Sequence, residues 1–140
     1  MQAPSNTETA RRFFEAIYAG DFDGAFSHHA HKDYRFAVGS ADDAELRAAI
    51  PWAGHPHVGQ SGYAELMEQL FSEFEPLSFE ARSYVESGDK VFVEGHFRFR
   101  HRITGKIADS DWLTRFDIRD GRIAGGQFYE NTYAVAKARS

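Results

Sequence analysis

The stretch KVFVEGHFRFRHRI, residues 90–103, alternates its side chains with a period of two. Its odd-numbered positions are mostly apolar and its even-numbered positions are mostly charged. Alternation of this length is typical of a β-strand that buries one face and exposes the other. We therefore expect a long strand here, with Phe97 and its odd-numbered neighbours packed on the core.

The segments on either side extend this pattern into a sheet. Residues 77–87, 106–119 and 122–132 also predict strands, and the short turns SGD, TG and DG suit antiparallel hairpins. Residues 33–38 predict one further short strand. Because these elements follow helical segments, the sequence indicates an α+β architecture formed by a single domain over residues 1–140.

Three helices are predicted before the meander of strands. Ser5 and Glu8 have capping-box spacing ahead of an apolar stripe that ends near Gly20. Asp21 is placed to cap a second, short helix. A third stripe covers about residues 60–74 and stops before Pro76. Residues 39–59 are expected to form a long connection with one helical turn in DDAELRAA. Connections of this length are often functional lids or disordered loops.

Composition narrows the classes of function. The net charge is −5, which disfavours a nucleic-acid partner. There are no cysteines, so disulfides and thiolate metal sites are excluded. No apolar run approaches the ~20 residues of a membrane span, and the N-terminus does not resemble a signal peptide. We expect a cytoplasmic protein without membrane contact. The 15% of aromatic residues can fill a core or line an apolar pocket.

Strand parity predicts which side chains face inward near the C-terminus. Trp112 and Thr114 share the apolar face of their strand. On the last strand, the parity of the apolar residue Ile123 directs Gln127, Tyr129 and Asn131 inward and Glu130 towards solvent. A bulge at Gly125–Gly126 would reverse this assignment.

The order of these elements resembles the SnoaL-like and ketosteroid-isomerase-like branch of the nuclear-transport-factor-two-like superfamily. ARRFFEAIYAGDFDGAF resembles the first two helices, IPWAGHPHVGQSGYAELMEQLF the glycine-led loop and long helix, and FYENTYAVAKA the closing strand. The resemblance implies a curved antiparallel sheet wrapped around N-terminal helices, a conical apolar pocket and a homodimer formed through the sheet. It does not imply one reaction.

The acid and base residues of the known relatives are not found at the matching positions. Where ketosteroid isomerases carry them, this chain has Phe13, Ala37 or a neighbour, and Trp112. Where limonene-epoxide-hydrolase-like members carry them, it has Gly95, Phe97 and Asn131. SnoaL-like cyclases tend to end with Tyr-x-Asp, whereas this chain has Asn131, which cannot serve as a general base.

The candidate ligand-binding residues lie on the short first strand, in the long loop and on the inward faces of the long strands. They are Tyr34, Phe36, Trp52, His55, His57, Phe97, Trp112, Thr114, Gln127, Tyr129 and Asn131. Trp52 would cap the pocket, and His55 or His57 would act as an acid or base near neutral pH. The alternatives are plain core packing for the aromatic residues, a surface loop for the histidines and an internally satisfied hydrogen-bond network for the amides.

Two functions are consistent with these sequence features. The first is an enzyme that transfers a proton to, or adds water to, an apolar ligand bearing a carbonyl or hydroxyl group. The second is a binding or accessory protein that uses the same pocket without catalysis. No catalytic residue is assigned and no cofactor is expected. The cluster of His28, His29 and His31 suits a solvated helix end better than a metal site.

Overall fold

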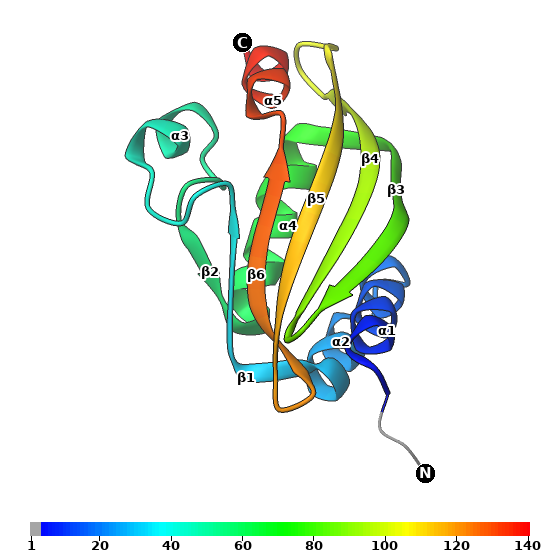
Figure 1. The fold of residues 1–140 in the computed structure, drawn as a ribbon. Coiled ribbons are helices and arrows are strands. Elements are labelled where there is room, and N and C mark those ends of the chain that lie inside the picture. Colours follow the sequence, from blue (N-terminus) through cyan, green and yellow to red (C-terminus); the bar gives the residue numbers. More distant parts are fainter. Residues whose placement is uncertain (1–3) are drawn as a thin grey trace.

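The computed structural model describes residues 4–140 of the chain (Figure 1). The elements, in order, are α1 (Asn6–Tyr18), α2 (Phe22–His29), β1 (Ala30–Val38), α3 (Ala44–Ala49), β2 (Pro56–Val58), α4 (Gly59–Glu73), β3 (Phe74–Ser87), β4 (Lys90–His101), β5 (Ile107–Arg119), β6 (Arg122–Glu130) and α5 (Thr132–Arg139). No helix among the described residues has the length and apolar character needed to cross a membrane.

The six strands form one sheet in the order β2-β1-β6-β5-β4-β3. Every neighbouring pair is antiparallel except β1 and β6, which run parallel. The sheet curves, and α4 crosses behind it while α1 and α2 lie at one end (Figure 1). The predicted α+β architecture, a curved sheet wrapped around N-terminal helices, is confirmed, and the sheet is not closed.

The first helices begin where their caps predict. The Ser5 hydroxyl accepts a hydrogen bond from the Glu8 amide, and Asp21 accepts one from the Gly24 amide. These bonds satisfy amides that have no partner within the helix. Phe13 and Phe14 of α1 are buried against the sheet, as the helical spacing predicts.

The faces of β4 and β5 are also as predicted. The buried residues of β4 are Val91, Val93, Gly95, Phe97, Phe99 and His101. On β5 the inward residues include Trp112, Thr114 and Phe116. The alternation of apolar and polar residues predicts these faces correctly because β4 and β5 pair without a register shift. The pairing joins residues Lys90–Arg100 of β4 to Ile107–Asp117 of β5.

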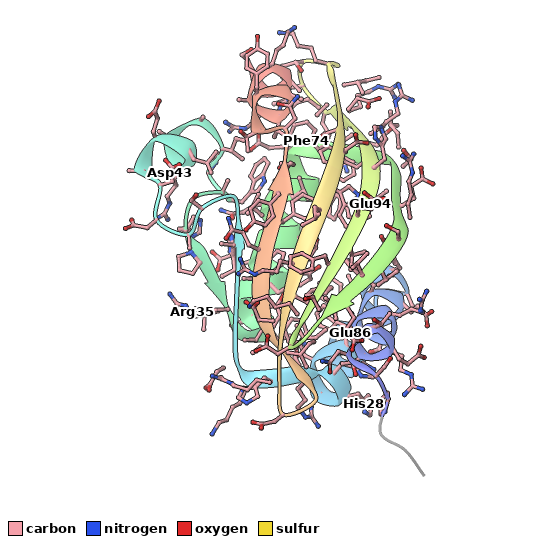
Figure 2. All side chains as sticks on the ribbon, in the orientation of Figure 1. His28, Arg35, Asp43, Phe74, Glu86 and Glu94 are labelled. Carbon is pink, nitrogen blue, oxygen red and sulfur yellow. The ribbon has the colours of Figure 1, made fainter. Side chains whose placement is uncertain are left out.

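The predicted boundary between the third helix and the following strand, near Pro76, is wrong. Helix α4 ends at Glu73, and β3 begins at once with Phe74, so Pro76 lies within a strand. Figure 2 shows Phe74 near the corner between α4 and β3. The proline is tolerated because β3 is an edge strand, where one ladder hydrogen bond can be missing.

The long connection 39–59 is largely ordered. Asp43 caps the short helix α3 through a 2.9 Å bond from the Leu46 amide. Strand β2 pairs with β1, with His57 opposite Phe36. Helix α3 lies within DDAELRAA, where one helical turn was predicted. Strand β2 was not predicted because its three residues are too few for a clear period.

The end of the chain also differs from the prediction. Strand β6 stops at Glu130, and Asn131 starts helix α5 rather than continuing the strand. The Asn131 carbonyl accepts from the Ala134 amide at 3.1 Å. Val135 and Ala138 of α5 are buried, so tertiary packing supports a helix too short to be stable alone.

A β-bulge in β6 reverses the predicted orientation of its last residues. Ile123 pairs with Ile118, but Gly125 already pairs with Asp117, so Ala124 is an extra residue on this strand. Beyond the bulge, Phe128 lies opposite Thr114 and the next inward position follows two residues later. The even-numbered residues therefore face inward, and the inward assignment of the odd-numbered ones is wrong.

Candidate active site

An apolar cavity of about 360 Å³ lies between the sheet and the helices. Fifteen of its 25 lining residues are aromatic, and they come from α1, α2, β1, the segment before β2, α4 and strands β3 to β6. Among the described lining residues, Glu130 is the only charged one. A large apolar cavity with few polar groups is the usual form of a small-molecule site.

The cavity walls are made of aromatic rings that pack on one another, some stacked and some edge to face. Phe97 and Phe99 of β4 lie 4.6 Å apart between ring centroids, and Phe79 stacks on Trp112 at 4.7 Å. Trp112 is not itself a lining residue. Its indole lies over Gly95, where an added Cβ would stand only 2.4 Å from the ring. Gly95 therefore provides the space that lets Trp112 support the ring of Phe79 from outside the cavity.

Glu130 is the last residue of β6 and lies opposite Trp112 on β5. The adjacent Asn131 amide donates to the Ser110 hydroxyl at 3.0 Å, which anchors the backbone at this point. Within residues 4–140 the Glu130 carboxylate forms no hydrogen bond and no ion pair. Burial raises the pKa of Glu130 from 4.5 to about 7. The predicted orientation of this side chain towards solvent is wrong, because the bulge in β6 reverses which residues face inward.

A carboxyl group with this pKa is present in both protonation states near neutral pH. It can take a proton from a ligand in one state and give a proton in the other. Thr114 and Tyr34 add hydroxyl groups to the lining. The Tyr34 hydroxyl is buried and has no hydrogen-bond partner among the described residues, and burial raises its pKa well above 10.

Five of the sequence-predicted site residues line this cavity: Tyr34, Phe36, Trp52, Phe97 and Thr114. All five are buried. Trp52 is held in place by an edge contact with Phe74 and by the guanidinium of Arg139, which lies 5.6 Å from its ring. Trp52 therefore forms part of the cavity wall, and its role as a cap over the pocket stays a prediction. Its contact with a ligand stays a prediction.

The histidines of the 39–59 segment lie outside the apolar cavity. His55 and His57 line a separate polar pocket with Arg47 and Glu65. The His57 Nε2 lies 2.7 Å from the Trp52 carbonyl, so this nitrogen donates a hydrogen bond. Burial lowers the pKa of His57, although the bond to the Trp52 carbonyl acts against the shift. The expectation that a histidine reaches the apolar pocket is not met.

Gln127, Tyr129 and Asn131 do not line the cavity either, which corrects their predicted inward orientation. Tyr129 is 42% exposed, and its hydroxyl accepts from Arg115 at 3.2 Å on the outer face of the sheet. Asn131 is exposed at the start of α5. The sequence feature that indicates an inward Glu130 is the pair Gly125–Gly126, because two consecutive glycines within a strand are typical of a bulge.

Both glycines of this pair are required by their surroundings. Gly126 has φ 154°, and a Cβ there would stand 1.8 Å from the Arg115 carbonyl oxygen. At Gly125 a Cβ would stand 1.7 Å from the Arg35 carbonyl oxygen. The bulge that turns Glu130 inward therefore depends on two residues without side chains.

The histidine cluster at the start of β1 does not converge on one point. His31 Nε2 lies 3.4 Å from an Asp120 carboxylate oxygen, whereas His28 and His29 belong to α2. Within residues 4–140, no group of three or more His, Asp or Glu side chains is arranged to hold a metal ion.

Comparison with known proteins gives a family and a fold. The model of the SnoaL-like domain matches residues 10–125. No curated protein matches the chain in sequence. The solved structures that it resembles include an NTF2-like protein from Burkholderia xenovorans, with 24% identity, a TM-score of 0.79, and 100% of this chain and 99% of that chain covered.

Two further structures carry functional names. TerC, co-crystallised with polyporic acid, is 20% identical with a TM-score of 0.78, and 96% of this chain and 98% of TerC are covered. A putative SnoaL-like polyketide cyclase from Jannaschia sp. is 18% identical with a TM-score of 0.74, covering 99% and 96%. At these identities the likeness shows the fold alone. Because the family model spans most of the sequence, the chain belongs to the SnoaL-like domain family.

Proposed function

We propose that this protein binds a small apolar molecule in its aromatic cavity and transfers a proton to or from it through Glu130. The observation that carries the proposal is the unpaired Glu130 carboxylate in an otherwise apolar cavity. Its pKa of about 7 supplies both the basic and the acidic form at neutral pH. An acid–base group is most effective when its pKa is near the working pH.

The surrounding groups suit a ligand with a carbonyl or hydroxyl oxygen. The carboxylate would take a proton from a carbon next to a carbonyl, and Thr114 or Tyr34 would donate a hydrogen bond to the oxygen. The aromatic walls offer water few hydrogen-bond partners, and electrostatic interactions are stronger where water is scarce. Isomerisation and ring closure both use such a proton transfer.

Names among the similar structures support this class of ligand. One neighbour is a putative polyketide cyclase, another is a putative isomerase from Bacillus subtilis, and TerC was crystallised with polyporic acid. The carboxyl group lies next to the position at which the resemblance predicts an acid. The chain lacks an acid at Asn131, but the bulge moves the inward position to Glu130, one residue earlier.

Binding without catalysis remains the second candidate. The observation that favours it is that Glu130 is the only charged group among the described lining residues, so no second acid or base is provided by the cavity. One group can still exchange a proton with a carbon acid by itself.

Exchange of carbon-bound hydrogen tests the proposal. β-Tetralone, a fused-ring ketone, is incubated with the protein in D2O, and loss of its α-proton signal is followed by NMR. We expect exchange that accelerates as pH rises through about 7. Glu130→Gln should lower the protein-dependent rate by at least ~100-fold, while Glu94→Gln, on the exposed face of β4, leaves it unchanged.

Two results would contradict the proposed catalysis. One is exchange of equal rate in the Glu130→Gln variant. The other is saturable binding of the ketone, seen by titration calorimetry, without any exchange above the buffer rate. The second result would establish the binding-only alternative.

A further inference from the structure

We infer that the aromatic cavity selects hydrophobic organic cations, such as a protonated amine on an apolar skeleton, over neutral or anionic molecules of the same shape. The inference goes beyond the proposed proton transfer and shares with it only the inward position of Glu130. A bound amine would occupy the carboxylate and so inhibit turnover of a neutral ligand competitively.

The charge of the cavity lining favours a cationic ligand. Glu130 is the single charged side chain among the described residues around the cavity, and no Lys, Arg or His is found with it. The carboxylate also has no hydrogen-bond donor within residues 4–140. The Glu130 side chain is partly buried. A charge that is partly withdrawn from water and has no partner is unfavourable, and a ligand that brings the opposite charge reduces that cost.

The aromatic rings of the lining also favour a cationic ligand. Aromatic faces carry negative potential and attract cations within about 6 Å of the ring centre. The rings here stand at different angles: 77° between Phe13 and Phe116, 71° between Phe71 and Phe99, and 26° between Phe97 and Phe99. A ligand in the cavity therefore meets ring faces as well as ring edges. Together with one carboxylate, such walls are typical of sites that recognise ammonium groups.

The remaining polar groups do not favour an anion. The other titratable lining residues are Tyr18, Tyr34 and Tyr63, and burial raises the pKa of each above 10. They stay uncharged at neutral pH and offer an anionic ligand only neutral hydroxyls. An anion in the cavity would also be repelled by the Glu130 carboxylate.

A charge series on one skeleton tests the inference. The probes are naphthylethylamine, naphthylethanol and naphthylacetate, and their Kd values are measured by titration calorimetry at about pH 8, where Glu130 is mostly ionised. We expect the amine to bind at least about tenfold more tightly than the alcohol, and the carboxylate to bind most weakly.

The Glu130→Gln variant separates cavity binding from general attraction to an acidic protein. We expect the variant to lose the amine preference while it binds the alcohol within about threefold of the parent. Glu94→Gln removes the same charge from the exposed face of β4 and should keep the preference. Lowering the pH to about 5 should weaken amine binding to the parent protein, because Glu130 then becomes protonated.

The inference is overturned if the alcohol binds as tightly as the amine, or if Glu130→Gln keeps the preference. Either result leaves the proposed proton transfer standing, since the alcohol still reports an accessible cavity. Failure of all three probes to bind, together with the absence of ketone exchange, would instead contradict both proposals.

Discussion

Gly126 controls the orientation of the residue proposed to carry the chemistry. A side chain at this position would collide with the Arg115 carbonyl, and its φ of 154° is rarely adopted by other residues. We expect Gly126→Ala to destabilise the protein by about 2 kcal/mol or more, measured by denaturant unfolding. The variant should also lose ketone exchange, because relaxation of the bulge moves Glu130.

Gly121 provides the matched control for this prediction. It also has a positive φ, 71°, but an added Cβ there meets no atom within 4 Å. Gly121→Ala should therefore cost only about 1 kcal/mol of left-handed strain and leave exchange intact. Equal losses of stability in the two variants would show that the close approach to Arg115 is unimportant.

Glu130 is predicted to lower the stability of the protein at neutral and alkaline pH. Its pKa in the folded chain, about 7, lies above the ordinary value of 4.5. Between these values the folded chain binds more protons than the unfolded chain, so stability falls as pH rises through this interval. The difference between the two pKa values corresponds to a loss of at most roughly 3 kcal/mol in the free energy of unfolding above pH 7.

Glu130→Gln should therefore raise the unfolding free energy at about pH 8 and leave it nearly unchanged at about pH 4. Thermal unfolding across this range measures the effect. A variant that is less stable than the parent at pH 8 would show that the carboxylate has a stabilising partner. A gain in stability together with a loss of exchange is the usual signature of a strained functional group.

At the scale of elements, α5 is held against the end of the sheet by a small ionic network. Arg139 donates to both Glu73 oxygens at 2.9 and 3.2 Å, and His101 lies 3.1 Å from the same carboxylate. The Nδ1 of His101 accepts from the Thr104 amide, so its Nε2 carries the proton that is donated to Glu73. Val135 of the same helix lines the cavity, so docking of α5 closes part of its wall.

Arg139→Ala should destabilise the protein by about 1–2 kcal/mol at pH 7. Partial burial raises the pKa of Glu73, but the bonds from Arg139 and His101 outweigh it and the pKa is lowered overall. The stabilisation is therefore present above the unfolded pKa and is lost as pH falls through the folded one. Hydrogen exchange of the α5 amides should accelerate in the variant.

Lys137→Ala is the control on the same helix, because Lys137 is exposed and does not contact Glu73 through a hydrogen bond or ion pair in the described chain. It should leave the α5 amides protected. If both variants behave alike, the network with Glu73 does not hold the helix.

At the scale of the whole molecule, the outer face of the sheet is the predicted homodimer interface. Most of its charges are already paired within the chain, for example Arg98 with Asp109 at 3.0 Å and His96 with Asp109 at 2.7 Å. Paired charges are less costly to cover than free ones. Tyr129, 42% exposed on the central strand β6, provides an aromatic anchor of the kind enriched at interfaces.

Light scattering after size exclusion should give twice the chain mass for the parent protein. Tyr129→Arg should weaken the dimer by at least about tenfold, because it places an unpaired charge in the interface. Tyr133→Arg, on the exposed side of α5, should not. A monomeric parent protein at about 100 μM would contradict the predicted interface.

The alternating strands and the striped helices of this protein were predictable from local sequence. Phe97 and Thr114 lie inward because side chains alternate strictly along a regular ladder, and Phe13 is buried because the apolar residues of α1 repeat at helical spacing. Tyr34, Phe36, Phe97 and Thr114 follow from strand alternation, whereas Trp52 lies in the loop between α3 and β2, where no period applies. A period is a property of neighbouring residues and needs no knowledge of the rest of the chain.

The acid–base group was decided by tertiary structure. Which of Glu130 and Asn131 faces inward depends on how β6 pairs with β5 across the bulge at Ala124, and that pairing joins residues distant in sequence. The pKa of Glu130 depends in turn on burial among side chains from other elements. The residue pattern predicted helices followed by strands with an aromatic inner face, and the packing of the sheet placed a carboxyl group on that face because the bulge depends on pairing between β5 and β6.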